Sequence, residues 1–197
     1  MFSIAVTGGI ASGKSLFGSI LSDLGADVAD ADEIVRALHR PGGRGALLVA
    51  SAFGSNYLLQ DGSTDRTRLS NLIFSDASAR QRLDDLLHPL VRNELLSWKD
   101  RPSASSVKVA QIPLLFEKGW ESDWDLTIDV EAPEHVRVER LLSRGLSEEQ
   151  SLSRINAQMT SAKRIGKADI VIYNDATIAE LEKAAQRLIH YLEKKQQ

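Results

Sequence analysis

The segment GGIASGKS, residues 8–15, is the feature that most constrains what this chain can fold into. It follows SIAVT (3–7), a short β-rich run, and precedes LFGSILSDLG (16–25), which has a helical pattern. The segment fits the pattern G-x-x-x-x-G-K-[S/T] in full, through Gly8, Gly13, Lys14 and Ser15. A strand, a glycine-rich loop and a helix in this order predict the first unit of an α/β sheet with a phosphate-binding loop.

The residue types of this loop suit an anionic ligand. Glycines allow backbone N–H groups to approach phosphate oxygens closely, and the following helix adds free N–H groups and a positive dipole end. Lys14 brings a mobile charge to the β- and γ-phosphates, and the Ser15 hydroxyl can bind Mg²⁺. The alternative is a glycine-rich turn with a solvent-facing lysine. We predict a nucleoside triphosphate site made by Gly9, Ile10, Ala11, Ser12, Gly13, Lys14, Ser15 and Leu16.

Further β-rich runs alternate with helical patterns along the chain. The runs are ADVAD (26–30), VKVAQI (107–112), LTIDVE (126–131) and IVIYN (170–174). This alternation predicts an α/β fold of βαβ units, whose five-stranded, mostly parallel sheet is flanked by helices. In the last helix, one face is expected to pack on the sheet through Ile178, Leu181, Ala185, Leu188 and Leu192.

Two intervals are too long for simple crossovers. Residues 33–102 indicate an inserted helical lobe, in which Pro89 is expected to start a new helix after a break at His88. Residues 133–165 indicate a helical hairpin, with a first helix ended by Gly145 and a second capped by Ser147 and Gln150. We expect a nucleotide-binding core (1–32, 103–132 and 166–197), an acceptor lobe (33–102) and a lid (133–165).

Composition narrows the functional class. The formal net charge of -3 gives no overall attraction to nucleic acid or anionic membrane. The chain has no cysteine, no signal-peptide pattern and no apolar run long enough to span a membrane. We therefore expect a cytoplasmic protein with neither a membrane nor a nucleic-acid partner.

The inserted lobes favour a small-molecule kinase over a hydrolase, because one lobe can hold an acceptor and the other can close over ATP. Two alternatives remain. One is a P-loop kinase for a nucleotide or another small hydroxylated metabolite. The other is an ATP-gated binding module that transfers nothing.

Asp32 is the candidate proton acceptor. It ends VADAD, just past the second expected strand, and the carboxyl ends of parallel strands share one edge with the phosphate loop. A carboxylate there can take the proton from an attacking hydroxyl. Asp30 is a close competitor, and either aspartate could instead cap a helix that begins at Glu33.

Arginines of the expected lid are candidates for binding the transferring phosphoryl group. Arg137, Arg140 and Arg144 follow one another at helical spacing, so one helix face could present all three, and Arg164 lies on the second arm. The alternative is a solvated surface stripe, partly paired with nearby glutamates.

The segment PLLFE (113–117) follows the third expected strand. Pro113 should end the sheet pairing, and Leu114 and Leu115 are expected to be buried. Glu117 could orient Mg²⁺ or a water, or simply be a helix-start acid. His88 could contact the acceptor, or mark a helix break.

These residues, taken in order, resemble dephospho-CoA kinases over nearly the whole chain. The resemblance is carried by VTGGIASGKS, VADAD, PGG, FG, DG followed by DR, LIF, HP, PLLFE, an R-x-x-x-R pair, RINAQ, R-x-x-x-AD and YND. It implies transfer of a phosphoryl group from ATP to the ribose 3′-hydroxyl of dephospho-CoA, the last step of coenzyme A biosynthesis, with Mg²⁺ as cofactor. We expect a monomer or weak homo-oligomer.

The resemblance also implies site residues. Asp32, Lys14 and Arg140 match catalytic positions, and Ser15 matches the metal position. Arg144 and Asn174 match nucleotide-binding positions. The acceptor would be bound by Asp32, Arg66, His88, Leu115 and Glu117.

Four positions depart from the family pattern. Ala11 and Leu16 replace a usual glycine and a common threonine, without removing a group that the mechanism needs. Gln111 stands where an aspartate is common, which weakens the expectation of a carboxylate near Mg²⁺. Ala176 replaces a usual glycine near the expected adenine edge.

Overall fold

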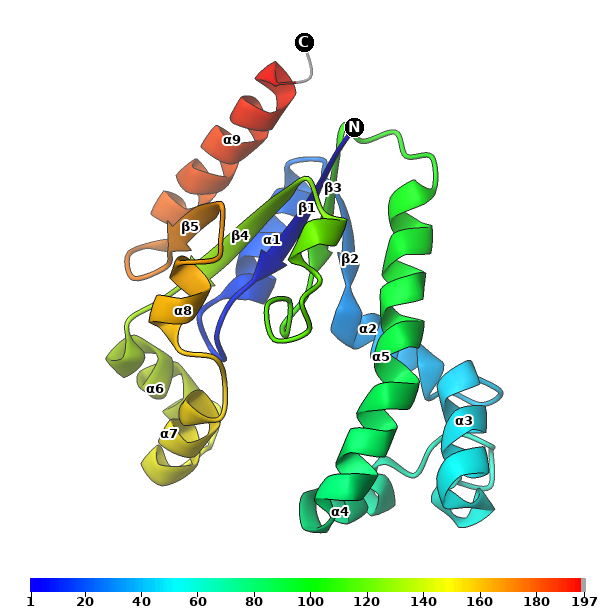
Figure 1. Ribbon diagram of the computed structural model, residues 1–197. Helices are drawn as coiled ribbons and strands as arrows, with labels where there is room; N and C mark the ends of the chain where they lie inside the picture. The colour runs from blue at the N-terminus through cyan, green and yellow to red at the C-terminus, as the bar shows by residue number, and fades with distance from the viewer. Residues whose placement is uncertain (196–197) are drawn as a thin grey trace. The chain divides into compact units, whose positions relative to one another are not determined.

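The computed structural model describes residues 1–195, which form two compact units (Figure 1). One unit comprises residues 1–29 and the chain from Pro102 onward, and the other comprises Asp30–Arg101. The first unit carries the phosphate loop and the segment expected to be the lid. The assignment of 133–165 to a separate lid stays a prediction.

The sheet has five strands in the order β2-β3-β1-β4-β5. β1 pairs in parallel with β3 and with β4, and β4 pairs in parallel with β5. β1 is therefore central, and the loop that follows it leaves from the middle of the carboxyl edge. The predicted α/β fold with a five-stranded parallel sheet is confirmed. The strands are β1 (Phe2–Thr7), β2 (Asp27–Asp30), β3 (Val107–Gln111), β4 (Leu126–Glu131) and β5 (Ile170–Tyr173).

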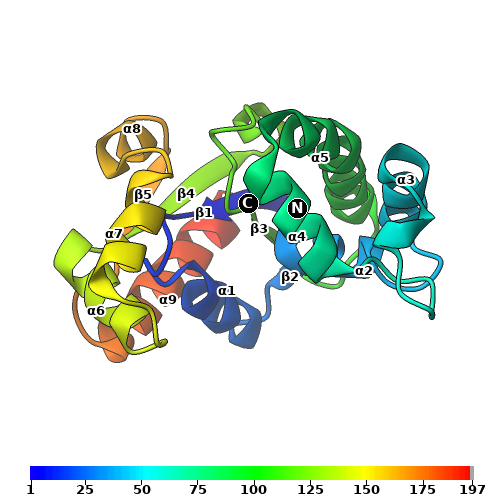
Figure 2. The same cartoon turned by 90° about the horizontal axis from the view of Figure 1, so that it is seen from below.

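Helices cover both faces of this sheet. α1 (Lys14–Asp23) and α9 (Ile178–Lys194) pack against each other on one face, and α8 (Ser161–Ile165) lies on the other side of β4 (Figure 2). Strand residues such as Ile4 and Ile128 are fully buried against α1 and α9. α9 buries Leu181, Ala185, Leu188 and Leu192, as predicted. Ile178 is 59% exposed instead, because it is the first residue of the helix and precedes the packed turns.

The segment from β4 to β5 contains two more helices, α6 (Glu134–Leu142) and α7 (Glu148–Asn156). Ser147 and Gln150 form the predicted capping box at the start of α7. α6 ends at Leu142, and Gly145 turns the chain with φ of 88°. Arg144 thus lies in the turn, and the expectation that it shares a helix face with Arg137 and Arg140 is wrong.

The second unit is helical, as predicted. α2 and α3 pack on α5, as does α4, and the interior contains Val49, Leu69, Leu83 and Leu87. Its elements are α2 (Ala31–Leu38), α3 (Arg44–Phe53), the short 3₁₀ helix η1 (Ser55–Tyr57), α4 (Arg66–Ser75) and α5 (Ala77–Asp100). A second 3₁₀ helix, η2 (Glu121–Asp123), belongs to the first unit. Over residues 1–195, no helix has the length and apolar character needed to cross a bilayer.

The predicted helix break at His88 is wrong, because α5 runs through Pro89. Its buried residues recur at every fourth position on both sides of the proline: Ala79, Leu83, Leu87, Val91 and Leu95. An interior proline costs about 3 kcal/mol. Burying one large aliphatic side chain contributes about 1.5–3 kcal/mol, so this continuous apolar face outweighs the proline.

Candidate active site

The phosphate loop has the backbone of an anion-binding nest. Gly13 is the N-cap of α1 with φ of 106°, and Ala11 has φ of 61°. Left-handed residues interleaved with ordinary ones turn successive N–H groups toward one concave side. A side chain at Gly13 is excluded, because its Cβ would lie 1.9 Å from Nδ2 of Asn174.

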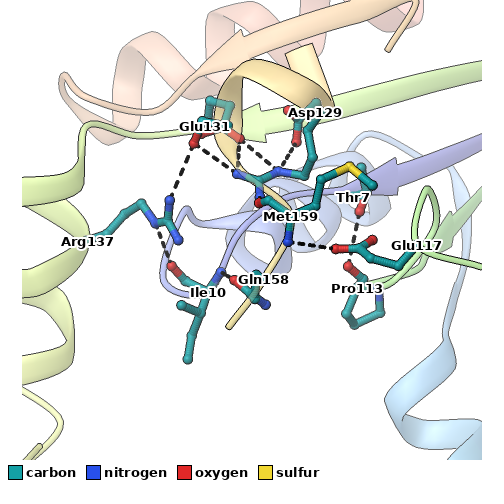
Figure 3. A network of polar contacts seen from close by, with 11 residues as sticks. Thr7, Ile10, Pro113, Glu117, Asp129, Glu131, Arg137, Gln158 and Met159 are labelled. Carbon is teal, nitrogen blue, oxygen red and sulfur yellow. Dashed lines mark hydrogen bonds and ion pairs between the residues drawn. The ribbon is translucent and has the colours of Figure 1, made fainter. Parts of the chain in front are cut away.

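Two arginines of α6 hold three successive carbonyl groups of this loop. Arg137 donates from Nε to the Ile10 oxygen over 2.9 Å (Figure 3). Arg140 donates from Nη1 to the oxygens of Ala11 and Ser12, over 3.1 Å in each case. The C=O and N–H of a trans peptide point in opposite directions, so the N–H groups of Ala11 and Gly13 turn away from α6. The sequence analysis made these arginines candidates for binding the phosphoryl group. In the structure both bond loop carbonyls, and a contact with phosphate stays a prediction.

Asn174 closes the same side of the loop from the end of β5. Its side-chain amide donates to the Ser12 oxygen over 2.8 Å, and its own carbonyl accepts from Arg140 Nη2 over 2.9 Å. Asn174 is 5% exposed. Its side-chain N–H group thus supports the loop from behind, whereas the neighbouring Asp175 is exposed.

The connection between α7 and α8 reaches the loop from the lid segment. Gln158 Oε1 accepts the Ile10 N–H over 2.7 Å, and the Met159 N–H donates to Glu117 Oε1 over 3.3 Å (Figure 3). Both backbone polar groups of Ile10 are therefore bonded, the C=O by Arg137 and the N–H by Gln158. Sequence reasoning missed both Gln158 and Met159. Gln158 is the last residue of the RINAQ motif, and Met159 follows it.

Three buried charged side chains lie near the phosphate loop. Arg164 bonds Glu131 through Nε, over 2.9 Å, and through Nη2, and its Nε is 3.4 Å from Asp129 Oδ1. All three side chains are almost fully buried. Arg164 is thus bound to carboxylates in the interior, beside Gly9 of the phosphate loop. Burial first, and then the charge of Glu131, raise the pKa of Asp129 to about 7.

The start of α1 presents the side chains expected for ATP and Mg²⁺. Lys14 is half-buried, and Ser15 and Leu16 are exposed in the first turn. One turn further on, Gly18 leaves a notch filled by the side chain of Gln111 from the end of β3. Within residues 1–195, the buried Gln111 Oε1 has no hydrogen-bond partner.

The alanine at position 11 has a local explanation. Its methyl group joins a small apolar cluster with Leu141 of α6 and Ile155 of α7. A left-handed backbone costs a non-glycine residue roughly 1–2 kcal/mol. Contact of the methyl group with the lid segment offsets part of that cost.

The PLLFE segment is partly as predicted. Leu115 is fully buried, but Leu114 is 39% exposed. The prediction for Leu114 is therefore wrong, because the turn after β3 leaves only the second leucine facing inward. Glu117 is exposed apart from its bond with Met159.

The remaining candidates lie in the second unit. α2 begins at Ala31, not at Glu33, and Asp30 caps it by accepting the Asp32 N–H over 2.8 Å. Asp32 is exposed in the first turn. Arg66 is the exposed first residue of α4, and His88 lies in α5 with Nε2 3.6 Å from Asp84 Oδ1.

Comparison with known proteins agrees with this fold. Residues 2–180 match the family described as dephospho-CoA kinase. The dephospho-CoA kinase of Frankia casuarinae is 39% identical over 92% of this chain and 80% of its own length. That of Geobacillus kaustophilus is 39% identical over 90% of both chains. The crystal structure of TT1252 from Thermus thermophilus superposes with a TM-score of 0.82, at 34% identity and 97% coverage of each chain.

These matches span almost the whole chain and confirm the expected function, phosphorylation of dephospho-CoA in the last step of coenzyme A biosynthesis. The chain belongs to the dephospho-CoA kinase family.

Proposed function

We propose that the loop from Gly9 to Leu16 binds ATP, with Lys14 on the β- and γ-phosphates. The observation that carries this proposal is that the carbonyl groups of Ile10, Ala11 and Ser12 are hydrogen-bonded to arginines of α6, which holds the loop in one conformation. A preset loop places N–H donors before the ligand arrives, so binding and reaction cost less reorganisation.

Mg²⁺ fits the oxygen donors at this end of the sheet. Ser15 offers an exposed hydroxyl, and Gln111 offers a buried amide oxygen without a hydrogen bond among the described residues. Residues 1–195 contain no group of three or more His, Cys, Asp or Glu side chains placed to hold a metal. This suits Mg²⁺, which usually keeps several waters and binds to substrate phosphates as well as to few protein groups. When bound, the ion would neutralise charge on the phosphates.

Asp32 is proposed as the base that takes the proton of the ribose 3′-hydroxyl. As that oxygen forms its bond to the γ-phosphorus, the bond to the bridging oxygen breaks and ADP leaves. Asp30 caps α2, so one of its carboxylate oxygens already accepts a backbone hydrogen bond. Asp32 is exposed and accepts no hydrogen bond of the kind that holds Asp30.

Arg140 is proposed to act on ATP while it holds the loop, because its half-buried side chain bonds the loop at Ala11 and Ser12. Arg144 is exposed in the turn after α6, and we propose that it contacts ATP when the lid segment moves. Asn174 is proposed to support the nucleotide site through Ser12.

The acceptor is proposed to contact Arg66, His88 and Glu117. Leu115 is fully buried, so its proposed part in substrate binding is to fix the segment that carries Glu117. We further propose that the protein works in the cytoplasm as a monomer or weak homo-oligomer, with ATP and dephospho-CoA as its ligands and without nucleic-acid or membrane partners.

Direct product detection tests this proposal. Purified protein is mixed with ATP, Mg²⁺ and dephospho-CoA, and CoA and ADP are resolved by chromatography beside reactions with AMP, CMP, adenosine or water as acceptor. CoA formed in step with ADP supports the proposal. ADP without CoA would point to another acceptor, and bound ATP without any ADP would point to a binding module.

A further inference from the structure

The second unit contains a cavity of which the proposed function uses only one lining residue, Arg66. It has a volume of about 520 Å³, and three arginines line it: Arg36, Arg40 and Arg66. All three side chains are exposed to solvent at its rim. Guanidinium groups that converge on one hollow favour a ligand with several anionic oxygens.

The cavity has a rigid floor. His39 and Thr64 are buried, and the Nδ1 atom of His39 lies 2.8 Å from the Thr64 hydroxyl. The Thr64 N–H also donates to the His39 carbonyl over 3.0 Å. These bonds tie the end of α2, which carries Arg36 and is followed by Arg40, to the start of α4, which carries Arg66.

The charges of the lining leave the arginines available. Asp61 accepts both the N–H and the O–H of Ser63, and Asp65 caps α4 by accepting the Arg68 N–H. Burial, and then the charge of Arg66, lower the pKa of His39, so its imidazole is neutral at pH 7. Over residues 1–195, neither Arg40 nor Arg66 forms an ion pair. Arg36 contacts Glu33 only at 3.8 Å, between two exposed side chains.

We propose that this cavity binds the 5′-diphosphate of dephospho-CoA, an inference that rests on the proposed function of Asp32. Asp32 and Arg36 lie one turn apart on the same face of α2, a rise of about 6 Å. In the acceptor, a single ribose separates the 3′-hydroxyl from the diphosphate on its 5′ carbon. A hydroxyl at Asp32 therefore brings the diphosphate to Arg36 and to the cavity beyond it.

The kinetic test pairs variants with acceptors. Arg36→Gln and Arg40→Gln are compared with Arg44→Gln, a control at an exposed arginine that does not line the cavity. Each variant is tested with two acceptors, dephospho-CoA and adenosine. Adenosine has the 3′-hydroxyl but no phosphate. We expect each cavity variant to raise the KM for dephospho-CoA about tenfold or more, since hydrogen bonds to charged groups are strong. The KM for ATP and the turnover of adenosine should change less than about twofold.

Equal losses with both acceptors would overturn the proposal, because the arginines would then act through the fold. A binding arm needs no turnover: inorganic pyrophosphate is titrated into ¹⁵N-labelled protein, and amide shifts are followed over residues 36–67. Saturable shifts that weaken in Arg36→Gln and Arg40→Gln, but not in Arg44→Gln, support the site even if no acceptor is phosphorylated. Absence of such shifts, or equal shifts in all variants, would refute it.

Discussion

The Nη1 atom of Arg140 lies 3.1 Å from the carbonyl oxygen of Ser12, so an arginine of α6 is bonded to the back of the phosphate loop. The same nitrogen bonds Ala11, and Nη2 bonds Asn174. One planar side chain thus joins the lid segment, the loop and the end of β5.

Replacing Arg140 by lysine should impair ATP binding while the charge is kept. A lysine ammonium lacks the planar fork that satisfies three carbonyls at once, and a buried acceptor left without a donor costs about 1–3 kcal/mol. We expect the KM for ATP to rise about tenfold or more and kcat to fall, with the KM for dephospho-CoA nearly unchanged. Steady-state kinetics check this, with His135→Ala, an exposed position on the same helix, as control. An unchanged KM for ATP would contradict it.

The two hydrogen bonds to the backbone of Ile10 give a second prediction. Gln158→Ala removes the acceptor of the Ile10 N–H, so exchange of that amide with solvent should speed up about tenfold in the free protein. If these hydrogen bonds preset the loop, the KM for ATP should rise as well. Amide exchange by NMR and steady-state kinetics are the measurements. Thr160→Ala is the control, since this exposed side chain makes no capping bond in the same connection. A lower KM for ATP would mean that Gln158 blocks the loop instead.

Asp32→Asn should remove the base without unfolding the helix. General base catalysis contributes about 10²- to 10⁴-fold, so kcat should fall by that order while ATP still binds. Rapid-quench measurement of CoA formation and calorimetric titration of ATP provide the two readouts. Retained turnover would show that another group takes the proton.

Asp30→Ala is the matched test for the neighbouring aspartate. Loss of a cap costs about 1 kcal/mol, so the free energy of unfolding should fall by that amount while kcat changes less than about threefold. A loss of kcat as large as that of Asp32→Asn would mean that both aspartates share the chemical step. Urea unfolding and initial rates distinguish the outcomes.

Patterns within a short stretch of sequence predicted the fold well. The strand, loop and helix around Gly13 and the cap at Ser147 depend on neighbours a few residues away. The predicted helix break before Pro89 was wrong, because burial of the apolar face of α5 outweighs the local cost of a proline inside the helix. Nothing local marks the bond from Ile10 to Gln158, which are 148 positions apart.

The buried charges were partly readable in the sequence. In LTIDVE, Asp129 and Glu131 are two positions apart in a strand, so both side chains lie on the same face. Two carboxylates on a buried strand require cationic partners. The sequence pattern does not indicate which arginine forms ion pairs with these two carboxylates. The structure selects Arg164, because α8 lies against β4.

The raised pKa of Asp129 predicts a pH-dependent stability. Its pKa is about 7 in the folded protein, against an ordinary value of 3.8, so the folded state holds a proton that the unfolded chain releases. The stability from this proton is complete below about pH 4 and is lost as the pH rises through about 7. The wild-type free energy of unfolding should therefore fall between pH 5 and pH 7.5, by at most about 1.4 kcal/mol per pH unit from this group.

Asp129→Asn should flatten this dependence and gain stability relative to wild type as the pH rises. Urea unfolding across that range measures it, with the exposed Asp175→Asn as control. Parallel curves for wild type and Asp129→Asn would show that Asp129 is already ionised at pH 5, held so by Arg164.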